Sequence, residues 1–236
     1  GAGIILPQKV HNIALTKLLI KFVNMNKVLN NSKVNGETTT EQQILAAAER
    51  EFVSKGFAGA RTTSIAEAAG VTHAMLHYYF RTKENLFEKI IAEKADMLQE
   101  VFLGAFGDES ATFSERIKMG VARHFDFVAA NPQLPMFVFN EVSRDAQRCA
   151  GFVNRAIIKG HKLIMSLQRQ IDDAAARGEC RPMDAGHFLM DIASLNLFTF
   201  IAAPLLETAG VAGRREEFLR ARKQENIETI MSRMKP

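Results

Sequence analysis

Hydroxyl, imidazole, phenol and ammonium groups gather between residues 62 and 83 of the chain. Thr72, His73, His77, Tyr78 and Lys83 all carry side chains that can hydrogen-bond to phosphate oxygens or to base edges. A solvated helix face normally carries Lys, Glu or Gln, so imidazole and phenol tips on a short helix are unusual. The same tips could instead pack at the rim of a core. The residue types therefore leave two alternatives, a DNA-reading face and a packing surface.

Two short helices joined by a glycine turn would position these side chains. Gly70 can adopt the positive φ of a residue just past a helix without a Cβ penalty, and Thr72 can cap the next helix. At helical spacing Leu76 and Phe80 face inward. The residues left facing outward are His73, Ala74, His77 and Tyr78. Two helices joined in this way form a helix-turn-helix unit, whose second helix enters the major groove of DNA.

Residues at neighbouring helix starts complete the expected DNA contacts. A capping Thr still leaves backbone N–H groups exposed to a phosphate. Lys83 lies in the first turn of the following helix, where the helix dipole disfavours a cation, so a nearby phosphate would resolve the mismatch. The predicted DNA-contacting residues are Arg61, Thr62, Thr63, Thr72, His73, Ala74, His77, Tyr78, Tyr79 and Lys83.

Longer helices are expected on both sides of this unit. A capping box that begins at Thr38 or at Thr39 opens the first one, and Gly56 closes it. Thr82 caps the next, which continues for roughly 20 residues to Gly104. At about 1.5 Å per residue this helix extends well beyond a small domain. It is the expected mechanical link to the rest of the chain.

Residues from about 40 to 90 resemble the DNA-binding domain of the TetR-type transcriptional regulators. The matching segments are Ile44–Phe52, Gly56–Phe57, Ile65–Thr72, Leu76–Phe80 and Lys83–Phe87. Their order and spacing make the resemblance specific, although it covers only about a fifth of the chain. The family usually has Tyr where this sequence has His77, so a contact normally made by a phenol is here made by an imidazole or lost. The resemblance also implies a sensing domain after residue 85.

Composition favours a helical protein. The chain has 236 residues, 47% of them hydrophobic, with only 6 prolines and no clear alternation typical of strands. Its net charge of +4 lies in residues 1–37, which hold five lysines and one acidic residue, and the remainder is neutral. Phosphate contacts must therefore come from a few placed donors and from helix N-termini.

The expected architecture is all-α. Residues 1–37 form an N-terminal extension, 38–85 a three-helix helix-turn-helix DNA-binding domain, and 86–236 a larger helical ligand-binding and dimerisation domain. We expect the residues before Met25 to be vector-derived or upstream sequence. The alternative is a basic arm that adds phosphate contacts. A secretory signal is not expected, because Lys17 and Lys21 interrupt the apolar run.

Aromatic and methionine residues dominate the region after residue 107, with a few polar groups among them. Apolar cavities with a few convergent polar groups are the usual form of a small-molecule site, whereas a Phe/Met stripe is more often core. Both interpretations stay open. The candidate effector-binding residues are His124, Phe127, Phe137, Asn140, Glu141, His161, Met165, Asn196 and Phe198.

The last two expected helices could pair with their twins in a four-helix bundle. The first, from Ala185 to Leu206, could be mistaken for a membrane span, but His187, Asp191 and Asn196 would be costly in lipid. The predicted interface residues are Phe188, Asp191, Ile192, Leu195, Phe218, Ile227 and Ile230. A homodimer is also what a reader of palindromic DNA half-sites needs.

Metal and catalytic sites are not predicted. His73 with His77, and His187 with Asp191, have the i,i+4 spacing of a helical chelate but no third ligand nearby. No catalytic motif occurs, no cofactor is expected, and the two cysteines suggest a reduced, cytoplasmic compartment.

The sequence thus predicts a homodimeric repressor that releases a palindromic operator when a small apolar molecule binds. The rivals are a DNA-binding dimer that senses nothing, and a helical carrier or enzyme with a vestigial helix-turn-helix.

Overall fold

The computed structural model describes residues 39–108, 110–145, 150–210 and 214–236, and the side chains of 150–159 are not among those described. The prediction for the extension 1–37 lies outside this range. The described residues form helices and no strands, which confirms the all-α class. The helices are α2 (Thr40–Gly59), α3 (Thr62–Ala68), α4 (His73–Phe80), α5 (Lys83–Phe106), α6 (Phe113–Ala130), α7 (Leu134–Arg144), α8 (Ala150–Ala176), α9 (Ala185–Thr208) and α10 (Arg215–Met234).

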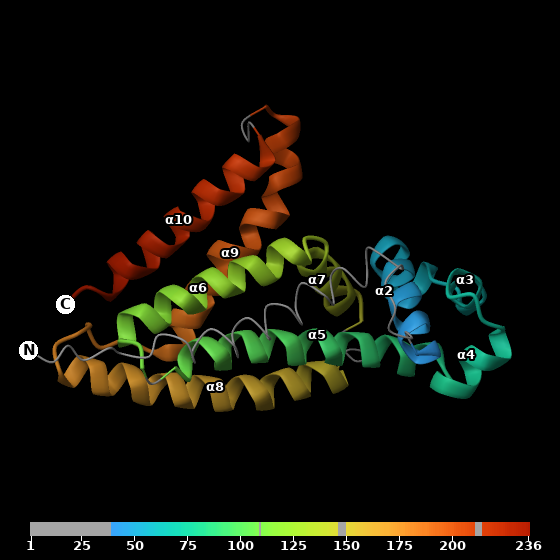
Figure 1. Cartoon of the computed structure of the whole chain (residues 1–236), viewed down its shortest axis with the longest axis horizontal. Coiled ribbons are helices and arrows are strands. Elements are labelled where there is room, and N and C mark those ends of the chain that lie inside the picture. The colour runs from blue at the N-terminus through green and yellow to red at the C-terminus, as the bar shows by residue number, and fades with distance from the viewer. Residues whose placement is uncertain (1–38, 109, 146–149, 211–213) are drawn as a thin grey trace, which may run out of the picture.

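The helix-turn-helix lies at one end of the molecule (Figure 1). Helices α2, α3 and α4 surround the N-terminal end of α5, which runs lengthwise beside α6 and α8. Helices α9 and α10 pack against α6, and α7 lies between α2 and α9. Helix α5 thus joins the two parts of the chain, as expected.

Local signals explain where the helices begin. Thr39 and Gln42 form the capping box of α2, Thr72 accepts the Met75 N–H at the start of α4, and Thr82 accepts the Asn85 N–H at the start of α5. The caps at Thr72 and Thr82 set where the connections α3–α4 and α4–α5 end.

The end of α2 differs from the prediction. Gly56 has φ 68° and ψ 171°, so it breaks the helix, but one more turn follows up to Gly59. The extra turn carries Phe57, whose ring stacks on Phe52 with centroids 5.9 Å apart and meets Phe87 edge-on at 5.2 Å. Aromatic packing against α5 therefore stabilises a turn that glycine alone would have ended.

The described residues form three apolar clusters, one N-terminal, one C-terminal and a smaller one around Phe125, Phe127 and Phe200. The N-terminal cluster extends from Ile44 in α2 to Ile91 in α5, and it also includes Phe137 from α7. This core therefore continues past residue 85 and takes in a helix that the sequence placed with the sensing region. The C-terminal cluster joins α5, α6, α8, α9 and α10.

Candidate nucleic-acid interface and effector region

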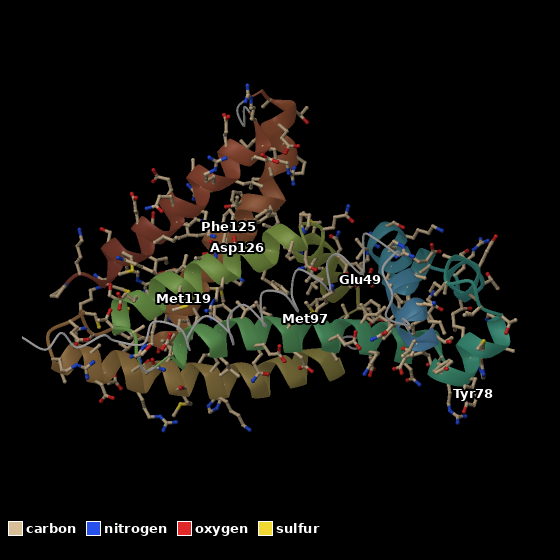
Figure 2. The ribbon with its side chains drawn as sticks, viewed as in Figure 1. Glu49, Tyr78, Met97, Met119, Phe125 and Asp126 are labelled. Atoms are coloured by element: carbon tan, nitrogen blue, oxygen red, sulfur yellow. The ribbon has the colours of Figure 1, made fainter. Side chains whose placement is uncertain are left out.

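The second helix of the unit, α4, presents the predicted polar face to solvent. Leu76 and Phe80 are buried, while His73, Ala74 and His77 are exposed. Tyr78 is 79% exposed, and Figure 2 shows it projecting away from the other helices. Because α4 uses only one side for packing, its outer side is accessible to a DNA groove.

Two of the predicted DNA-contacting residues bind each other. Thr62 Oγ1 at the start of α3 and His73 Nε2 at the start of α4 are 3.0 Å apart, within hydrogen-bonding distance. Both side chains lie at helix N-termini, where N–H groups favour an anion. The contact fixes the imidazole of His73 relative to α3.

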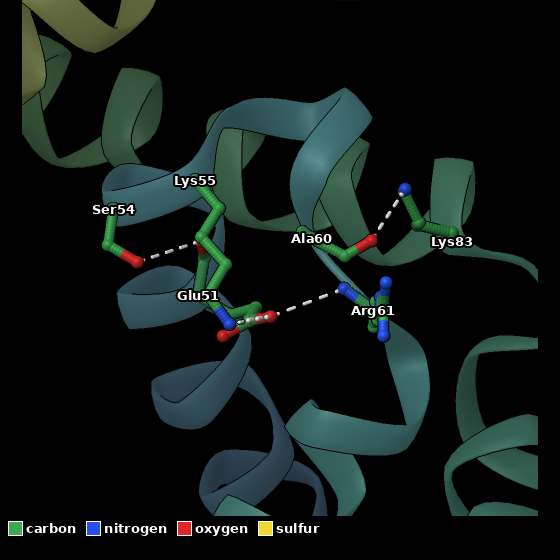
Figure 3. Close-up of polar contacts among 6 residues, drawn as sticks. All are labelled: Glu51, Ser54, Lys55, Ala60, Arg61 and Lys83. Carbon is green, nitrogen blue, oxygen red and sulfur yellow. Dashed lines mark hydrogen bonds and ion pairs between the residues drawn. The ribbon is translucent and has the colours of Figure 1, made fainter.

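The start of α3 is held by α2. Glu51 Oε1 accepts hydrogen bonds from the Arg61 N–H at 3.3 Å and from Lys55 Nζ at 2.8 Å (Figure 3). The hydrogen bond from Lys55 is the main cause that lowers the pKa of the Glu51 carboxyl below its ordinary value. The Arg61 side chain is exposed and points away from this carboxylate.

Lys83 has a protein partner where the sequence suggested a phosphate. Its Nζ donates to the Ala60 carbonyl oxygen at 2.8 Å (Figure 3) and lies 4.5 Å from the centroid of the Phe57 ring. The mismatch with the α5 dipole is therefore resolved inside the protein, because a carbonyl at the end of α2 attracts a cation. Lys83 joins α2 to α5.

The candidate effector residues do not converge on one place. His124 and Asn196 are buried and contact each other, and Phe127 is buried in a cluster with Phe125 and Phe200. By contrast, Asn140 and His161 are exposed, Met165 is 48% exposed and Phe198 66% exposed. Phe137 and Glu141 belong elsewhere: Phe137 packs in the N-terminal core, and Glu141 contacts the backbone of α2.

The buried polar group in the larger part is a chain of amides and an imidazole. Asn196 Nδ2 lies 3.0 Å from His124 Nδ1, and Asn226 Nδ2 donates to Asn196 Oδ1 at 2.9 Å. The Asn196 NH₂ group can only donate, so His124 Nδ1 accepts and the ring is neutral. Burial lowers the pKa of His124 to about 4. Sequence patterns predicted the first two residues, but Asn226 on α10 was missed because it looked like one more polar residue on a charged helix.

Two hollows lie along α10 rather than among the candidate effector residues. One, of about 850 Å³, lies between α6 and α10 and is lined by residues that include Met119, Ile227 and Met231. The other, of about 520 Å³, borders α10 residues that include Arg220 and Lys223. Both have charged as well as apolar walls.

The predicted dimer residues are only partly available to a partner. Phe188, Ile192 and Ile230 are at most 1% exposed within the single chain, so they stabilise its own core and cannot contact a second copy. The half-buried residues of the prediction are Asp191, Leu195, Phe218 and Ile227, of which Asp191 forms an ion pair with Arg233.

A different side of α9 is exposed. Met190 and Phe198 are each 66% exposed and Leu205 is 72% exposed, and their spacing places them along one stripe of the helix. The sequence did not single out this stripe, because α9 is apolar on nearly all sides.

Two further features of the described residues concern metals and membranes. No group of three or more His, Cys, Asp and Glu side chains that could hold a metal ion occurs in this part of the chain. Helix α9 is long and apolar enough to cross a membrane by length and composition, with a mean hydropathy of 1.7, but such a single helix is weak evidence. It packs against α6, α8 and α10.

Known proteins with similar sequences are transcriptional regulators. Residues 44–90 match the model of the bacterial regulatory proteins of the tetR family. The chain is 25% identical over 166 residues to the probable HTH-type transcriptional regulator YttP of Bacillus subtilis, which covers 70% of this chain and 79% of the relative. It is 27% identical over 206 residues to the HTH-type transcriptional regulator RutR of Escherichia coli, covering 81% and 88%.

A solved structure shows the same fold. The transcriptional regulator FadR from Bacillus subtilis, in complex with stearoyl-CoA, has a TM-score of 0.61 and 19% identity, covering 81% of this chain and 98% of that one. The resemblance found at residues 40–90 is confirmed by the match of the family model and by relatives that extend over most of the chain. Residues 44–90 therefore match the DNA-binding domain of the tetR family, and the chain is similar over most of its length to transcriptional regulators of that type.

Proposed function

We propose that this protein is a cytoplasmic, homodimeric repressor that binds a palindromic operator through α4 and releases it when an effector binds. The observation that carries the proposal is the outer face of α4, where His73, His77 and Tyr78 are exposed above a buried Leu76 and Phe80. A short helix that packs on one side and carries hydrogen-bonding tips on the other suits a major groove.

The neutral charge after residue 37 shapes the proposed contact with DNA. Phosphate contacts come from placed groups, which we propose to be Arg61, Thr63, Tyr78 and the N-termini of α3 and α4. Few phosphates are neutralised, so the affinity should fall less steeply with salt than it does for a strongly basic DNA-binding protein.

We propose that the dimer forms through the exposed stripe of α9 together with α10. Met190, Phe198 and Leu205 are large apolar side chains that are exposed in the single chain. Pairing of these two helices with their twins would bury them in a four-helix bundle. The two copies of α4 would then face half-sites about 34–36 Å apart.

The proposed effector is a small molecule with a long apolar part. The support is indirect: a relative of the same fold has been solved with stearoyl-CoA, and the region of α5, α6 and α9 is rich in Phe. The amide–imidazole chain of His124, Asn196 and Asn226 offers it polar partners.

DNA binding is tested by footprinting on the duplex that flanks the protein's own gene, followed by titration of the protected segment. Tyr78→Ala should weaken binding at least about tenfold, as expected for a phenol that contacts the groove or backbone. Phe139→Ala is the matched control, because it also removes an exposed ring, 65% exposed, but on α7. Equal affinities of both variants and the wild type would place the reading face elsewhere.

A further inference from the structure

Helix α7 connects the sensing part of the molecule to the helix-turn-helix independently of α5. Its Phe137 is buried in the N-terminal core, and the same helix packs against α2 on one side and α9 on the other. One turn later on α7, Glu141 is 2% exposed and its Oε1 accepts the backbone N–H of Phe57 at 3.1 Å. The two residues are 84 positions apart in the sequence.

The break at Gly56 makes this contact possible. With φ 68° and ψ 171°, Gly56 interrupts the hydrogen-bond ladder of α2, and the next turn starts afresh with the Ala60 N–H donating to the Gly56 carbonyl. Phe57 is therefore at the N-terminus of a single turn, where N–H groups need an acceptor. The Glu141 carboxylate acts as its cap from another helix, and a negative charge is favoured at that position.

Glycine is required at residue 56 for a second reason. A Cβ there would lie 2.9 Å from Glu141 Oε1 and 3.4 Å from Nη1 of Arg144, so a side chain would displace the carboxylate. The positive φ and the close approach of α7 thus select glycine together.

The turn that Glu141 caps, residues 57–60, directly precedes the helix-turn-helix. It carries Phe57, which packs on Phe87 of α5, and it leads to Ala60, whose carbonyl oxygen binds Lys83 at the start of α5. The next residue, Arg61, is the N-cap of α3. A shift of α7 would therefore displace this turn, and with it both α3 and the N-terminal end of α5.

A second polar bridge supports the same junction. Lys94 of α5 is 8% exposed; its Nζ lies 2.8 Å from Glu49 of α2 and 3.1 Å from Asn131, which ends α6 just before α7. Figure 2 shows Glu49 on the side of α2 that faces the larger part of the molecule. The segment that leads into α7 is thus linked to α2 through Lys94, and α7 itself is linked to α2 through Glu141.

We propose that Glu141 is a positioning residue for operator binding: through the Phe57 N–H it fixes the orientation of the helix-turn-helix relative to the sensing part. Conformational changes around α9 then reach the DNA through α7. The inference rests on the proposed function, since it assumes that the wild-type protein binds a palindromic duplex.

The test compares Glu141→Ala, Glu141→Gln and, as a control on a nearby exposed position of α7, Ser143→Ala. The probes are the wild type's footprinted duplex and versions with its half-sites moved apart by one or two base pairs. Glu141→Ala should raise Kd about tenfold or more, as expected when a charged hydrogen-bond acceptor is lost. The Glu141→Ala variant should also bind duplexes with different half-site spacings with more nearly equal affinities than the wild type does. Glu141→Gln, which keeps an acceptor, should restore most of the affinity, and Ser143→Ala should match the wild type.

Amide hydrogen exchange gives a direct readout of the contact. In Glu141→Ala, the Phe57 amide should exchange faster while the amides in the first three turns of α2 keep their protection, which a general loss of stability would not produce. If Glu141→Ala does not fold, Glu141→Asp, whose carboxylate is one methylene shorter, takes its place with the same expectations. Unchanged affinity, spacing preference and Phe57 exchange in the folded variant would overturn the proposal. Failure of the wild type to bind any duplex would instead contradict the proposed function.

Discussion

An ammonium group beside a helix-turn-helix has two competing partners, a DNA phosphate and a backbone carbonyl. Lys83 has the carbonyl, because its Nζ lies 2.8 Å from the Ala60 oxygen and above the Phe57 ring. Ala60 is the C-cap of α2, where the partial negative charge of the helix end attracts a cation. The residue thus contributes first to the stability of the N-terminal part, and any phosphate contact must compete with that hydrogen bond.

Replacement of Lys83 by Met should therefore lower the free energy of unfolding. The methionine keeps the apolar stem but cannot donate to Ala60, and the loss should be roughly 1–2 kcal/mol in urea titrations. Lys89→Met is the control: Lys89 and Glu93 form an exposed pair at 3.6 Å, which contributes little. Equal stabilities of the two variants would show that the Ala60 contact is weak in solution.

The imidazole of His124 makes the stability of the larger part depend on pH. Burial lowers its pKa to about 4. In the unfolded chain a His has a pKa of about 6.5 and takes up a proton first as the pH falls. The stabilisation by neutral His124 is therefore complete above pH 6.5 and is lost as the pH falls towards 4, by about 3 kcal/mol in total.

The measurement is chemical denaturation of the wild type and of His124→Gln between pH 7.5 and pH 4.5. Gln can accept from Asn196 but does not titrate in this range. The difference in unfolding free energy between the two proteins should shrink steadily below pH 6.5. A difference that stays constant with pH would mean that His124 is not buried in its neutral form.

Sequence patterns predict a helix best when one of its faces differs from the other. The capped starts at Thr39, Thr72 and Thr82 and the buried Leu76 and Phe80 of α4 follow directly from such signals. Two kinds of feature could not be predicted from the sequence. Helix α9 is apolar all round, so no pattern could show which side faces the core and which faces outward.

Contacts between segments far apart in the sequence could not be predicted either. The extra turn after Gly56 persists because Phe57 packs on Phe87 and because Glu141 caps it, and both partners lie far along the chain. The same is true of Lys83, whose carbonyl partner is 23 residues away. Local spacing cannot reveal a partner that only the folded arrangement of helices brings near.

Two glycine substitutions should have opposite effects on stability. Gly56→Ala meets a positive φ of 68° and the Glu141 carboxylate at 2.9 Å, so it should destabilise the protein by about 1–3 kcal/mol. Gly160 lies inside α8, where a Cβ would have nothing within 4 Å, so Gly160→Ala should stabilise the protein by roughly 0.5–1 kcal/mol. Thermal unfolding of both variants measures the difference, and a shift of the same sign in both would contradict the role of Gly56.

At the scale of the whole molecule, the exposed apolar side of α9 argues for a partner. Soluble proteins seldom expose several large apolar side chains along one helix unless an interface covers them. Met190, Phe198 and Leu205 are all more than half exposed in the single chain. Helix α7 lies between α9 and the helix-turn-helix, so pairing through α9 would leave α4 accessible (Figure 1).

Phe198→Asp should convert the proposed dimer to a monomer, because a carboxylate would be buried without a partner in the proposed interface. Sedimentation velocity measures the change, and affinity for the palindromic duplex should fall with it because two half-sites no longer bind together. Phe139→Asp changes an equally exposed ring on α7 and should leave the dimer intact. A dimeric Phe198→Asp protein would mean that another face pairs.

The hydrogen bond between Thr62 and His73 has an evolutionary consequence. Because the two side chains bind each other, a substitution at either position also releases the other from its place at the DNA-facing surface. If a substitution of His73 changed the DNA sequence that the protein recognises, Thr62 would lose its partner in the same step. Descendants with a different residue at one position should differ at the other, so this pair of positions would be inherited as one unit of DNA recognition.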